Sequence, residues 1–293
     1  GNVQMQYMWK YALPFLPTLD KKYDIAISYL WPHYLVANKV NAKRKIAWIH
    51  TDYSTVETDV LEDMTVWEKF DSIIAVSEAC KASFLEKYGE LAGKLHVIEN
   101  IQSPKFIRQM ATKRISDAFA SDRRFKIVTV ARLSYAKGID NAVRALRRIK
   151  ELGINDIAWY VVGYGGDEQQ LRALIRDMEL EDDFFLLGKR TNPYPYIRDC
   201  DLYVQPSRYE GKAVTVTEAK ILGKPILITR YPTSSSQIIN GVDGIICERS
   251  VEGLADGIVE AYRNAELRER LSTYCNQSDY ENREELNKLY ALF

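Results

Sequence analysis

Short runs of β-branched and aromatic residues alternate with longer stretches of helical periodicity along most of the chain. In the C-terminal half, the short runs cover residues 125–133, 158–165, 184–188, 202–207, 224–229 and 244–248. The helical stretches cover residues 138–152, 167–179, 194–199, 213–222, 234–240 and 251–274. Unbroken apolar strands that alternate with amphipathic helices are typical of a parallel sheet covered on both faces. This alternation predicts a doubly wound α/β domain.

The N-terminal half shows the same alternation more sparsely. Its β-rich runs cover residues 23–30, 45–50, 72–77 and 94–99. They predict a second α/β unit, and a length of 293 residues also favours two domains. The polar stretch 103–124 contains no β-rich run and is the predicted link. We therefore expect a first domain over 1–115, a second over 116–275 and a C-terminal helix over 276–293.

The charge balance argues against one class of function. With 40 basic and 40 acidic residues, the chain has no global field for a polyanion, so a small or neutral ligand is favoured over a nucleic acid. The first 50 residues carry seven Lys and Arg against two acids, which leaves room for contact with an anionic membrane surface. The apolar segment MQYMWKYALPFLP either packs on its own domain or lies in a membrane interface.

Cysteine and histidine spacing predicts no metal site. The four cysteines lie far apart without a C-x-x-C pair, so neither a disulfide framework nor a thiolate site is indicated. His33, His50 and His96 are isolated from one another. No run reaches the ~18 apolar residues that a membrane-spanning helix needs, and no signal peptide opens the chain. We expect a soluble, cytoplasmic protein without a cofactor.

Two cations follow the first predicted strand of the second domain. The run 125–133 ends near Arg132, and the loop after it delivers Lys137 next to Gly138, where a helix is expected to begin. Two cations and a helix N-terminus suit a pyrophosphate group. The alternative is a pair of solvated surface cations.

Two carboxylates, Glu210 and Glu218, follow the strand LYVQPS. Glu210 comes first and is followed by Gly211, which allows a ligand to approach the backbone, so the amides of Lys212, Ala213 and Val214 are candidates to face an anion. Glu218 is expected about one turn inside the next helix and reaches the same pocket. As alternatives, Thr215 and Glu218 form a capping box, or the run AVTVT is itself a strand.

The combination of these segments resembles a known family. The runs SRYEGKAVTVTEAKILGKPILIT, VARLSYAKG and NPYPYIRDCDLYVQPS are similar to the nucleotide-sugar domain of retaining GT-B glycosyltransferases of family 4. They are closest to the bacterial branch that builds capsular and other surface polysaccharides. The resemblance continues through KIAWIHTDYS and FDSIIAVSEACKASFLEKYG. It implies two Rossmann-like domains that face a cleft. Because the strand and Gly-rich loop that normally open the acceptor-side domain are not seen, that domain is expected to be incomplete.

The resemblance assigns roles to matching residues on the donor side. Glu218 would bind the ribose hydroxyls of a nucleotide, and Glu210 would orient the donor sugar. Arg132 and Lys137 would hold the diphosphate and neutralise the charge that grows as the glycosidic bond breaks. The backbone amides of 211–214 would add to this cradle.

Further roles follow from the same resemblance. Arg190 and Tyr194, in KRTNPY, would lie beside the base. His50, with Asp52 close by, would reach the sugar as a catalytic residue; a structural histidine is the alternative. The last helix would cross back onto the first domain through residues at helical spacing, or remain on the second. These residues are Leu286, Leu289, Tyr290 and Phe293.

The implied activity is metal-independent transfer of a sugar, with retention of configuration, from a nucleotide sugar to a saccharide or lipid-linked acceptor in polysaccharide synthesis. UDP is the expected nucleotide because it is common among such enzymes. Three alternatives stay open at this point. They are a hydrolase that uses Glu210 and Glu218 as acid and base, a nucleotide-sugar epimerase on the same fold, and a glycosyltransferase-like partner subunit without catalytic activity.

Overall fold

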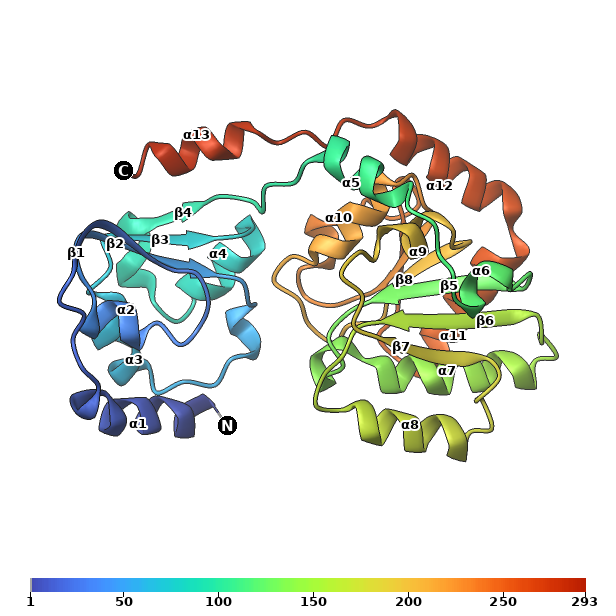
Figure 1. The fold of residues 1–293 in the computed structure, drawn as a ribbon, viewed down its shortest axis with the longest axis horizontal. Coiled ribbons are helices and arrows are strands. Elements are labelled where there is room, and N and C mark those ends of the chain that lie inside the picture. The colour runs from blue at the N-terminus through green and yellow to red at the C-terminus, as the bar shows by residue number, and fades with distance from the viewer. Residues whose placement is uncertain (1) are drawn as a thin grey trace. The chain divides into compact units, whose positions relative to one another are not determined.

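A computed structural model describes residues 2–293 and contains two parallel sheets, which confirms the predicted α/β class (Figure 1). The chain forms two compact units. The first contains the residues up to Ile101 together with Asn282–Phe293, and the second contains Gln102–Glu281. This division differs from the predicted boundary between residues 115 and 116.

The sheet of the first unit has four parallel strands in the order β1-β2-β3-β4. They cover Lys22–Ser28, Asn41–Ile49, Ser72–Ala75 and Leu95–Val97. The helices of this unit are α1 (Asn2–Ala12), α2 (Tyr34–Lys39), α3 (Val60–Trp67), α4 (Glu78–Leu85) and α13 (Glu284–Tyr290). Each predicted β-rich run of this half therefore overlaps a strand.

Aromatic side chains fill the core of the first unit. The ring of Trp67 lies 5.0 Å from that of Phe84, and the ring of Phe84 lies 4.7 Å from that of Tyr88. The buried carboxylate of Asp63 accepts hydrogen bonds from Trp67 Nε1 (3.0 Å) and from the Tyr88 hydroxyl (2.6 Å). Because these donors compensate for lost water, the carboxylate is tolerated within the core.

The sheet of the second unit has six parallel strands in the order β10-β9-β8-β5-β6-β7. In chain order they cover Phe125–Val130, Ile157–Val162, Phe184–Gly188, Leu202–Gln205, Ile226–Thr229 and Ile245–Cys247. The chain runs outward from β5 to β7, crosses back to β8 beside β5, and then runs outward the other way. This order is that of a doubly wound sheet.

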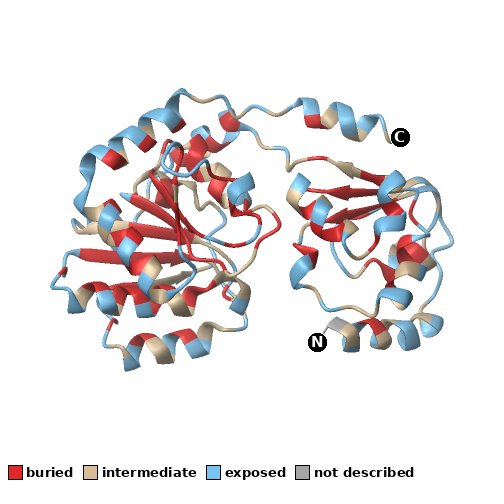
Figure 2. Cartoon of the chain, turned by 180° about the vertical axis from the view of Figure 1, so that it is seen from behind, coloured by how far each residue is buried: buried red, intermediate tan, exposed pale blue. Residues whose placement is uncertain are grey.

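Helices cover both faces of this sheet, so its strands are apolar on both sides. Trp159 on β6 packs in a buried cluster with residues of α7 (Ile139–Glu151), α8 (Glu168–Asp177) and α11 (Val251–Arg263). The next residue, Tyr160, packs in a second cluster with α9 (Tyr194–Arg198) and α10 (Val214–Ile221). Figure 2 shows most of the residues of these strands in the colour of buried residues. The unbroken apolar runs of the sequence are thus explained.

The segment predicted as a link, 103–124, contains two short helices, α5 (Pro104–Ala111) and α6 (Ala118–Ser121). Helix α5 packs against α9 and α10. Because this packing joins α5 to the second unit, the two units divide ahead of the predicted boundary.

Two other expectations differ from the structure, and a third, that the last helix joins the first domain, differs only in the residues that make the contact. The predicted helix 234–240 is only a 3-10 turn over Ser234–Ser236. The expected stretch 251–274 is two helices, since the side chain of Asn264 accepts a hydrogen bond from Leu267 N (2.9 Å) and starts α12 (Ala265–Gln277). Finally, α13 packs against the core of the first unit through Leu289, with Leu292 just after it, whereas Tyr290 and Phe293 are exposed.

Candidate active site

The sheet of the second unit has a topological switch point where β5 and β8 lie side by side. In open α/β sheets, ligands bind beyond the carboxyl ends of the strands at such a point. Strand β5 continues into the loop that carries Arg132 and Lys137. Strand β8 continues into the loop that carries Glu210. The topology therefore brings the predicted cations and one predicted carboxylate to the same edge of the sheet.

Lys137 and Glu210 form an ion pair at this edge. Lys137 Nζ lies 2.7 Å from Glu210 Oε1 and 2.6 Å from Oε2. The Glu210 side chain is 7% exposed and that of Lys137 is 25% exposed. Glu210 Oε1 also accepts hydrogen bonds from Ser207 Oγ (2.6 Å) and from Gln205 Nε2 (3.2 Å). These four contacts fix the orientation of the carboxylate.

Gln205 and Ser207 are site residues that the sequence reasoning missed. The Gln205 amide is oriented by two donors to its oxygen, the Tyr203 hydroxyl (2.9 Å) and Thr215 Oγ1 (3.3 Å). The available signal was a polar residue at the end of the apolar strand LYVQ. Thr215 is thus engaged with Gln205, and α10 begins at Val214 without a side-chain cap. The capping-box interpretation of Thr215 and Glu218 is therefore wrong, and so is the interpretation of AVTVT as a strand.

Gly138 allows the two loops to approach each other. It has φ 62°, in the left-handed region, and separates the 3-10 turn Tyr135–Lys137 from α7. A Cβ atom at this position would overlap the carbonyl oxygen of Pro206, just beyond β8. Only glycine fits both the backbone angle and the space.

Glu218 lies on α10, as expected, and contacts another predicted residue. Its Oε1 accepts a hydrogen bond from the Tyr194 hydroxyl (3.1 Å). Burial raises the pKa of Glu218, and the hydrogen bond from Tyr194 partly offsets this rise. Burial, together with the nearby Glu218 carboxylate, raises the pKa of Tyr194 to about 12. The tyrosine is therefore a hydrogen-bond donor at neutral pH.

A pocket of about 360 Å³ lies beyond the carboxyl ends of β5, β6 and β7. Its lining includes Arg132, Tyr164, Lys189, Arg190 and Thr215. Arg190 is held from one side, because its Nε donates to the Tyr196 hydroxyl (3.1 Å) and its Nη2 lies 3.4 Å from Asp117 Oδ2. Thr215, which bonds to Gln205, connects this pocket to the Lys137–Glu210 pair.

The backbone cradle expected over 211–214 is only partly available. The amide of Ala213 donates to Gln237 Oε1 (3.0 Å), and Gln237 Nε2 donates back to the Ala213 carbonyl (3.0 Å). The amide of Ala213 is therefore already occupied, unlike the expectation. Gly211 and Val214 remain candidate donors of this segment.

His50 belongs to the first unit, directly after β2. Its ring centroid lies 4.5 Å from that of Tyr29 and 6.2 Å from that of Trp48. Burial lowers its pKa, against a hydrogen bond with the backbone of Tyr29. Within residues 2–293, neither His50 Nε2 nor Asp52 Oδ2 has a hydrogen-bond partner, although both atoms are buried. Asp52 Oδ1 accepts from Ser54 N (3.0 Å).

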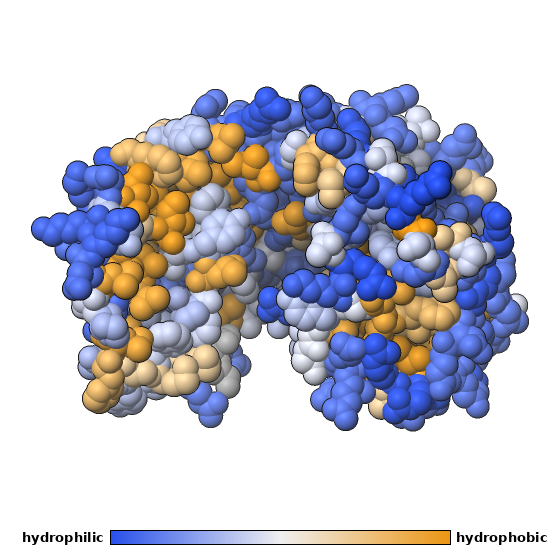
Figure 3. All heavy atoms as spheres, viewed as in Figure 1, coloured by the Kyte–Doolittle hydropathy of each residue, from blue (hydrophilic) through white to orange (hydrophobic). Residues whose placement is uncertain are grey.

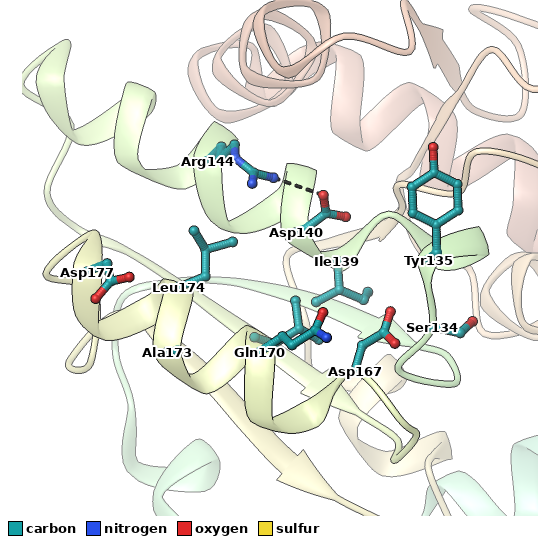
Figure 4. Close-up of a pocket in the computed structure, with 11 residues that line it drawn as sticks. Ser134, Tyr135, Ile139, Asp140, Arg144, Asp167, Gln170, Ala173, Leu174 and Asp177 are labelled. Carbon is teal, nitrogen blue, oxygen red and sulfur yellow. Dashed lines mark hydrogen bonds and ion pairs between the residues drawn. The ribbon is translucent and has the colours of Figure 1, made fainter.

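A second cavity, of about 440 Å³, lies between α7 and α8 (Figure 4). Asp140, Arg144, Asp167 and Gln170 line its polar part. Its walls are mainly helix faces, and it contains none of the predicted site residues. We therefore place the candidate site at the strand ends and not in this larger cavity.

The two parallel sheets and the site at the switch point define a GT-B glycosyltransferase fold. Solved structures support this class. A glycosyltransferase from Rickettsia africae superposes with a TM-score of 0.73 at 16% identity, over 99% of this chain and 78% of that one. The Anabaena protein HepE in complex with UDP gives a TM-score of 0.69 at 19% identity, over 85% of this chain and 72% of that one.

Residues 111–278, more than half of the chain, match the family model of the glycosyl transferases group 1, and the chain belongs to this family. A glycosyltransferase of Methanocaldococcus jannaschii is 26% identical over 69% of this chain and 52% of its own. The poly(ribitol-phosphate) α-N-acetylglucosaminyltransferase of Staphylococcus aureus is 25% identical over 67% of this chain and 38% of its own. The chain thus spans about half the length, or less, of these curated relatives.

Two features are absent from the described residues 2–293. No helix in this part of the chain has both the length and the apolar character needed to cross a bilayer. Likewise, these residues bring together no group of three His, Cys, Asp or Glu side chains suited to a metal ion.

Proposed function

We propose that the chain is the catalytic part of a retaining, metal-independent glycosyltransferase of family 4. It transfers a sugar from a nucleoside-diphosphate sugar, with UDP as the nucleotide, to a saccharide or lipid-linked acceptor in cell-surface polysaccharide synthesis, such as that of a capsule. The observation that carries the proposal is the partly buried Lys137–Glu210 pair at the switch point, whose carboxylate is fixed by Ser207 and Gln205.

The cations beside β5 suit the diphosphate of the donor. Lys137 directly precedes Gly138 and the N-terminus of α7, where backbone amides and the helix dipole favour negative charge. Arg132 lines the adjacent pocket. As the bond between the anomeric carbon and the β-phosphate oxygen breaks, its electron pair moves onto that oxygen, and these cations stabilise the growing charge.

We assign Glu210 to the orientation of the donor sugar. Its Oε1 already accepts three hydrogen bonds, whereas Oε2 accepts only that of Lys137 among the contacts of the described residues. A carboxylate oxygen has two acceptor positions, so Oε2 can accept a sugar hydroxyl.

Glu218 suits the ribose of the nucleotide. Tyr194 occupies one of its oxygens, and the other is available for the vicinal hydroxyls of a ribose. The base would then lie in the pocket beside Arg190 and Tyr164. UDP is supported by fold relatives, since HepE was solved with UDP and a pneumococcal O-GlcNAc transferase with UDP and GlcNAc.

Retention is supported by the names of relatives. The Staphylococcus aureus relative and a poly(glycerol-phosphate) α-glucosyltransferase of Bacillus subtilis are both named for α-linked transfer. The common UDP-hexoses carry an α-linked diphosphate, so an α product keeps the configuration. In the proposed step, the acceptor oxygen bonds to the anomeric carbon from the side that the diphosphate leaves. The acceptor proton passes to the departing phosphate oxygen. We assign His50, whose Nε2 has no partner among residues 2–293, to a contact with this sugar.

We place the protein in the cytoplasm, with peripheral contact to the inner face of the membrane. Met8, Tyr11 and Phe15 are 49%, 69% and 88% exposed, and Figure 3 shows apolar atoms on the visible surface of the first unit. Lys21 and Lys22 follow closely in sequence. Such a combination suits an anionic interface that contains a lipid-linked acceptor.

The test is a thermal-shift screen of nucleoside diphosphates and nucleotide sugars. A ligand at a hundredfold excess over its Kd stabilises by about 2.7 kcal/mol. Glu218→Ala should abolish the shift, because the ribose loses its acceptor. Glu210→Ala should keep the shift with UDP alone and lose turnover.

Glu269→Ala, an exposed change on α12, is the matched control and should behave as the wild type. A wild-type protein that responds to no nucleotide would overturn the proposed function. Equal losses of UDP binding at Glu218 and Glu210 would overturn the division of roles between them.

A further inference from the structure

One side chain outside the predicted site, that of Arg208, connects the two loops that carry Lys137 and Glu210. Its guanidinium makes a bidentate pair with Asp140, with Nη1–Oδ1 2.7 Å and Nη2–Oδ2 2.8 Å. Arg208 lies in the loop after β8, whereas Asp140 lies in the first turn of α7, after the loop that follows β5. The pair therefore spans the switch point of the sheet.

Arg208 also contacts the backbone and ring of the opposite loop. Its Nη1 donates to the Tyr135 carbonyl (2.8 Å), and its own amide donates to the Ala136 carbonyl (2.8 Å). The guanidinium carbon lies 4.1 Å from the centroid of the Tyr135 ring. Its side chain is only 16% exposed. One arginine thus uses its charge, its hydrogen-bond donors and its flat face on a single short segment.

These contacts flank the Lys137–Glu210 pair on both sides. In the chain, Lys137 lies between the Tyr135–Ala136 backbone and Asp140, and Glu210 follows Arg208 by two residues. Figure 4 shows Tyr135 on the turn that leads into α7 and Asp140 at the start of that helix. If Arg208 moved away, the segments before and after Lys137 in the chain would both lose a contact that holds them.

We propose that Arg208, acting through Asp140 and Tyr135, is a positioning residue that holds the diphosphate-binding lysine against Glu210. This inference rests on the proposed function. The side chain of Lys137 is long and flexible, so the placement of its backbone decides which atoms the ammonium reaches. Ser207 and Gln205 fix Glu210 from the strand side, and Arg208 fixes the loop of its partner.

The ionisation of Asp140 supports a persistent pair. Burial alone would raise the pKa of this carboxyl, but hydrogen bonds from Arg208 and, to a smaller extent, Arg144 lower the pKa below its ordinary value. The carboxylate is therefore charged throughout the neutral range. Arg144 Nη1 also contacts Asp140 Oδ2 (2.8 Å), but it does so one turn along the same helix. Among the described residues, Arg144 makes no hydrogen bond or ion pair with either loop and thus provides a matched control.

The first measurement is hydrogen exchange of backbone amides in segments 133–140 and 207–212, without added ligand. We expect Arg208→Ala to accelerate exchange in both segments and Arg144→Ala to leave both unchanged. If Arg208→Ala leaves both segments as protected as in the wild type, the proposal is overturned. This readout is independent of transferase activity, so it decides the role of Arg208 even where the proposed function fails.

The second measurement is steady-state transfer. A misplaced lysine affects the transition state most, because the leaving diphosphate gains charge there. We therefore expect Arg208→Ala to lower kcat by about 100-fold and to change KM for the donor by no more than about threefold. Arg208→Lys keeps one charge without the planar fork and should recover only a small part of kcat.

Asp140→Asn removes the opposite charge in a side chain of the same shape and serves where Arg208→Ala fails to fold. It should reproduce the kcat loss with the helix start intact. An unchanged kcat in Asp140→Asn, or a loss that falls on KM alone, would contradict the positioning role.

Discussion

His33 is a buried titratable residue with a structural role in the first unit. Its Nδ1 lies 2.8 Å from Ser28 Oγ, and its ring packs 4.8 Å from Trp67 and 6.0 Å from Phe70. Burial, with a smaller repulsion from His50, lowers the pKa of His33 to about 4. The His33 side chain therefore stays neutral in the native state down to about pH 4. In the unfolded chain, the same side chain takes up a proton near its ordinary pKa of ~6.5.

This difference predicts a pH-dependent loss of stability. Because the pKa is lower in the folded state, the stabilisation is present above about pH 6.5 and is lost as the pH falls to about 4. The advantage of the wild type over His33→Gln should shrink by about 3 kcal/mol across this range. Denaturant unfolding at several pH values measures it. A constant difference between the two proteins would show that His33 does not titrate as inferred.

At the scale of single residues, the sequence predicted the charged members of the site and missed their neutral partners. Lys137, Glu210 and Glu218 stand at recognisable distances from strand ends, and a charge at such a place indicates a ligand. Gln205 and Ser207 carry no such signal, because the partner of an amide or a hydroxyl depends on which chain segment folds next to it. The use of the Ala213 amide by Gln237, 24 residues away, is unpredictable for the same reason.

The loop between β5 and α7 shows how an element boundary positions chemistry. Gly138 ends the 3-10 turn, starts α7 and passes close to Pro206. An added Cβ meets two penalties there, the left-handed backbone, at roughly 1–2 kcal/mol, and the overlap with a carbonyl oxygen.

Gly138→Ala should therefore displace the loop that carries Lys137. Gly153 is the matched control, because it also has a positive φ (82°) but has open space around its Cβ position. We expect Gly153→Ala to cost only about 1–2 kcal/mol of unfolding free energy and to keep activity. Gly138→Ala should cost more and should lower kcat by about 100-fold. Equal effects at both glycines would rule out the close approach as the cause.

At the scale of elements, prediction succeeded where the period was unambiguous. The strands of the second unit were predictable because both of their faces are buried, which leaves long apolar runs. The short helices α5 and α6 were not, since their polar composition resembles a linker and only packing on α9 and α10 makes α5 part of the second unit. The prediction of a helix over 234–240 was wrong for a related reason. The local pattern does not reveal that a buried lysine, Lys220, contacts the Gln237 carbonyl there.

In the whole molecule, the first unit is built from both ends of the chain. Helix α13 is separated from Ile101 by the whole second unit in sequence, yet Glu285 Oε2 accepts a hydrogen bond from Glu99 N (2.9 Å). Asn282 Nδ2 donates to the Asn100 carbonyl (3.1 Å), and Arg44 Nη1 to the Leu292 carbonyl (2.8 Å). The first unit thus depends on residues that follow the whole of the second unit in sequence.

Truncation after Glu281 should destabilise the first unit selectively. We expect its melting temperature to fall by about 5–10 °C, with the second unit unchanged. Four of the five tryptophans lie in the first unit, so fluorescence of a Trp159→Phe protein reports on that unit alone. The control is Tyr290→Ala with Phe293→Ala, which removes only exposed rings. A truncated protein that melts like the full chain would show that α13 contributes nothing to this core.

The salt bridge at the switch point has a consequence for ligand discrimination. Lys137 and Glu210 cancel each other's charge in a partly buried setting. Sulfate that draws the ammonium away from Glu210 leaves the carboxylate without its counterion, and sulfate carries no proton that could replace the lost hydrogen bond. A glycosyl diphosphate brings phosphoryl oxygens for the Lys137 ammonium and hydroxyl protons for the Glu210 carboxylate in the same molecule. The ion pair should therefore favour a glycosyl diphosphate over sulfate at this site.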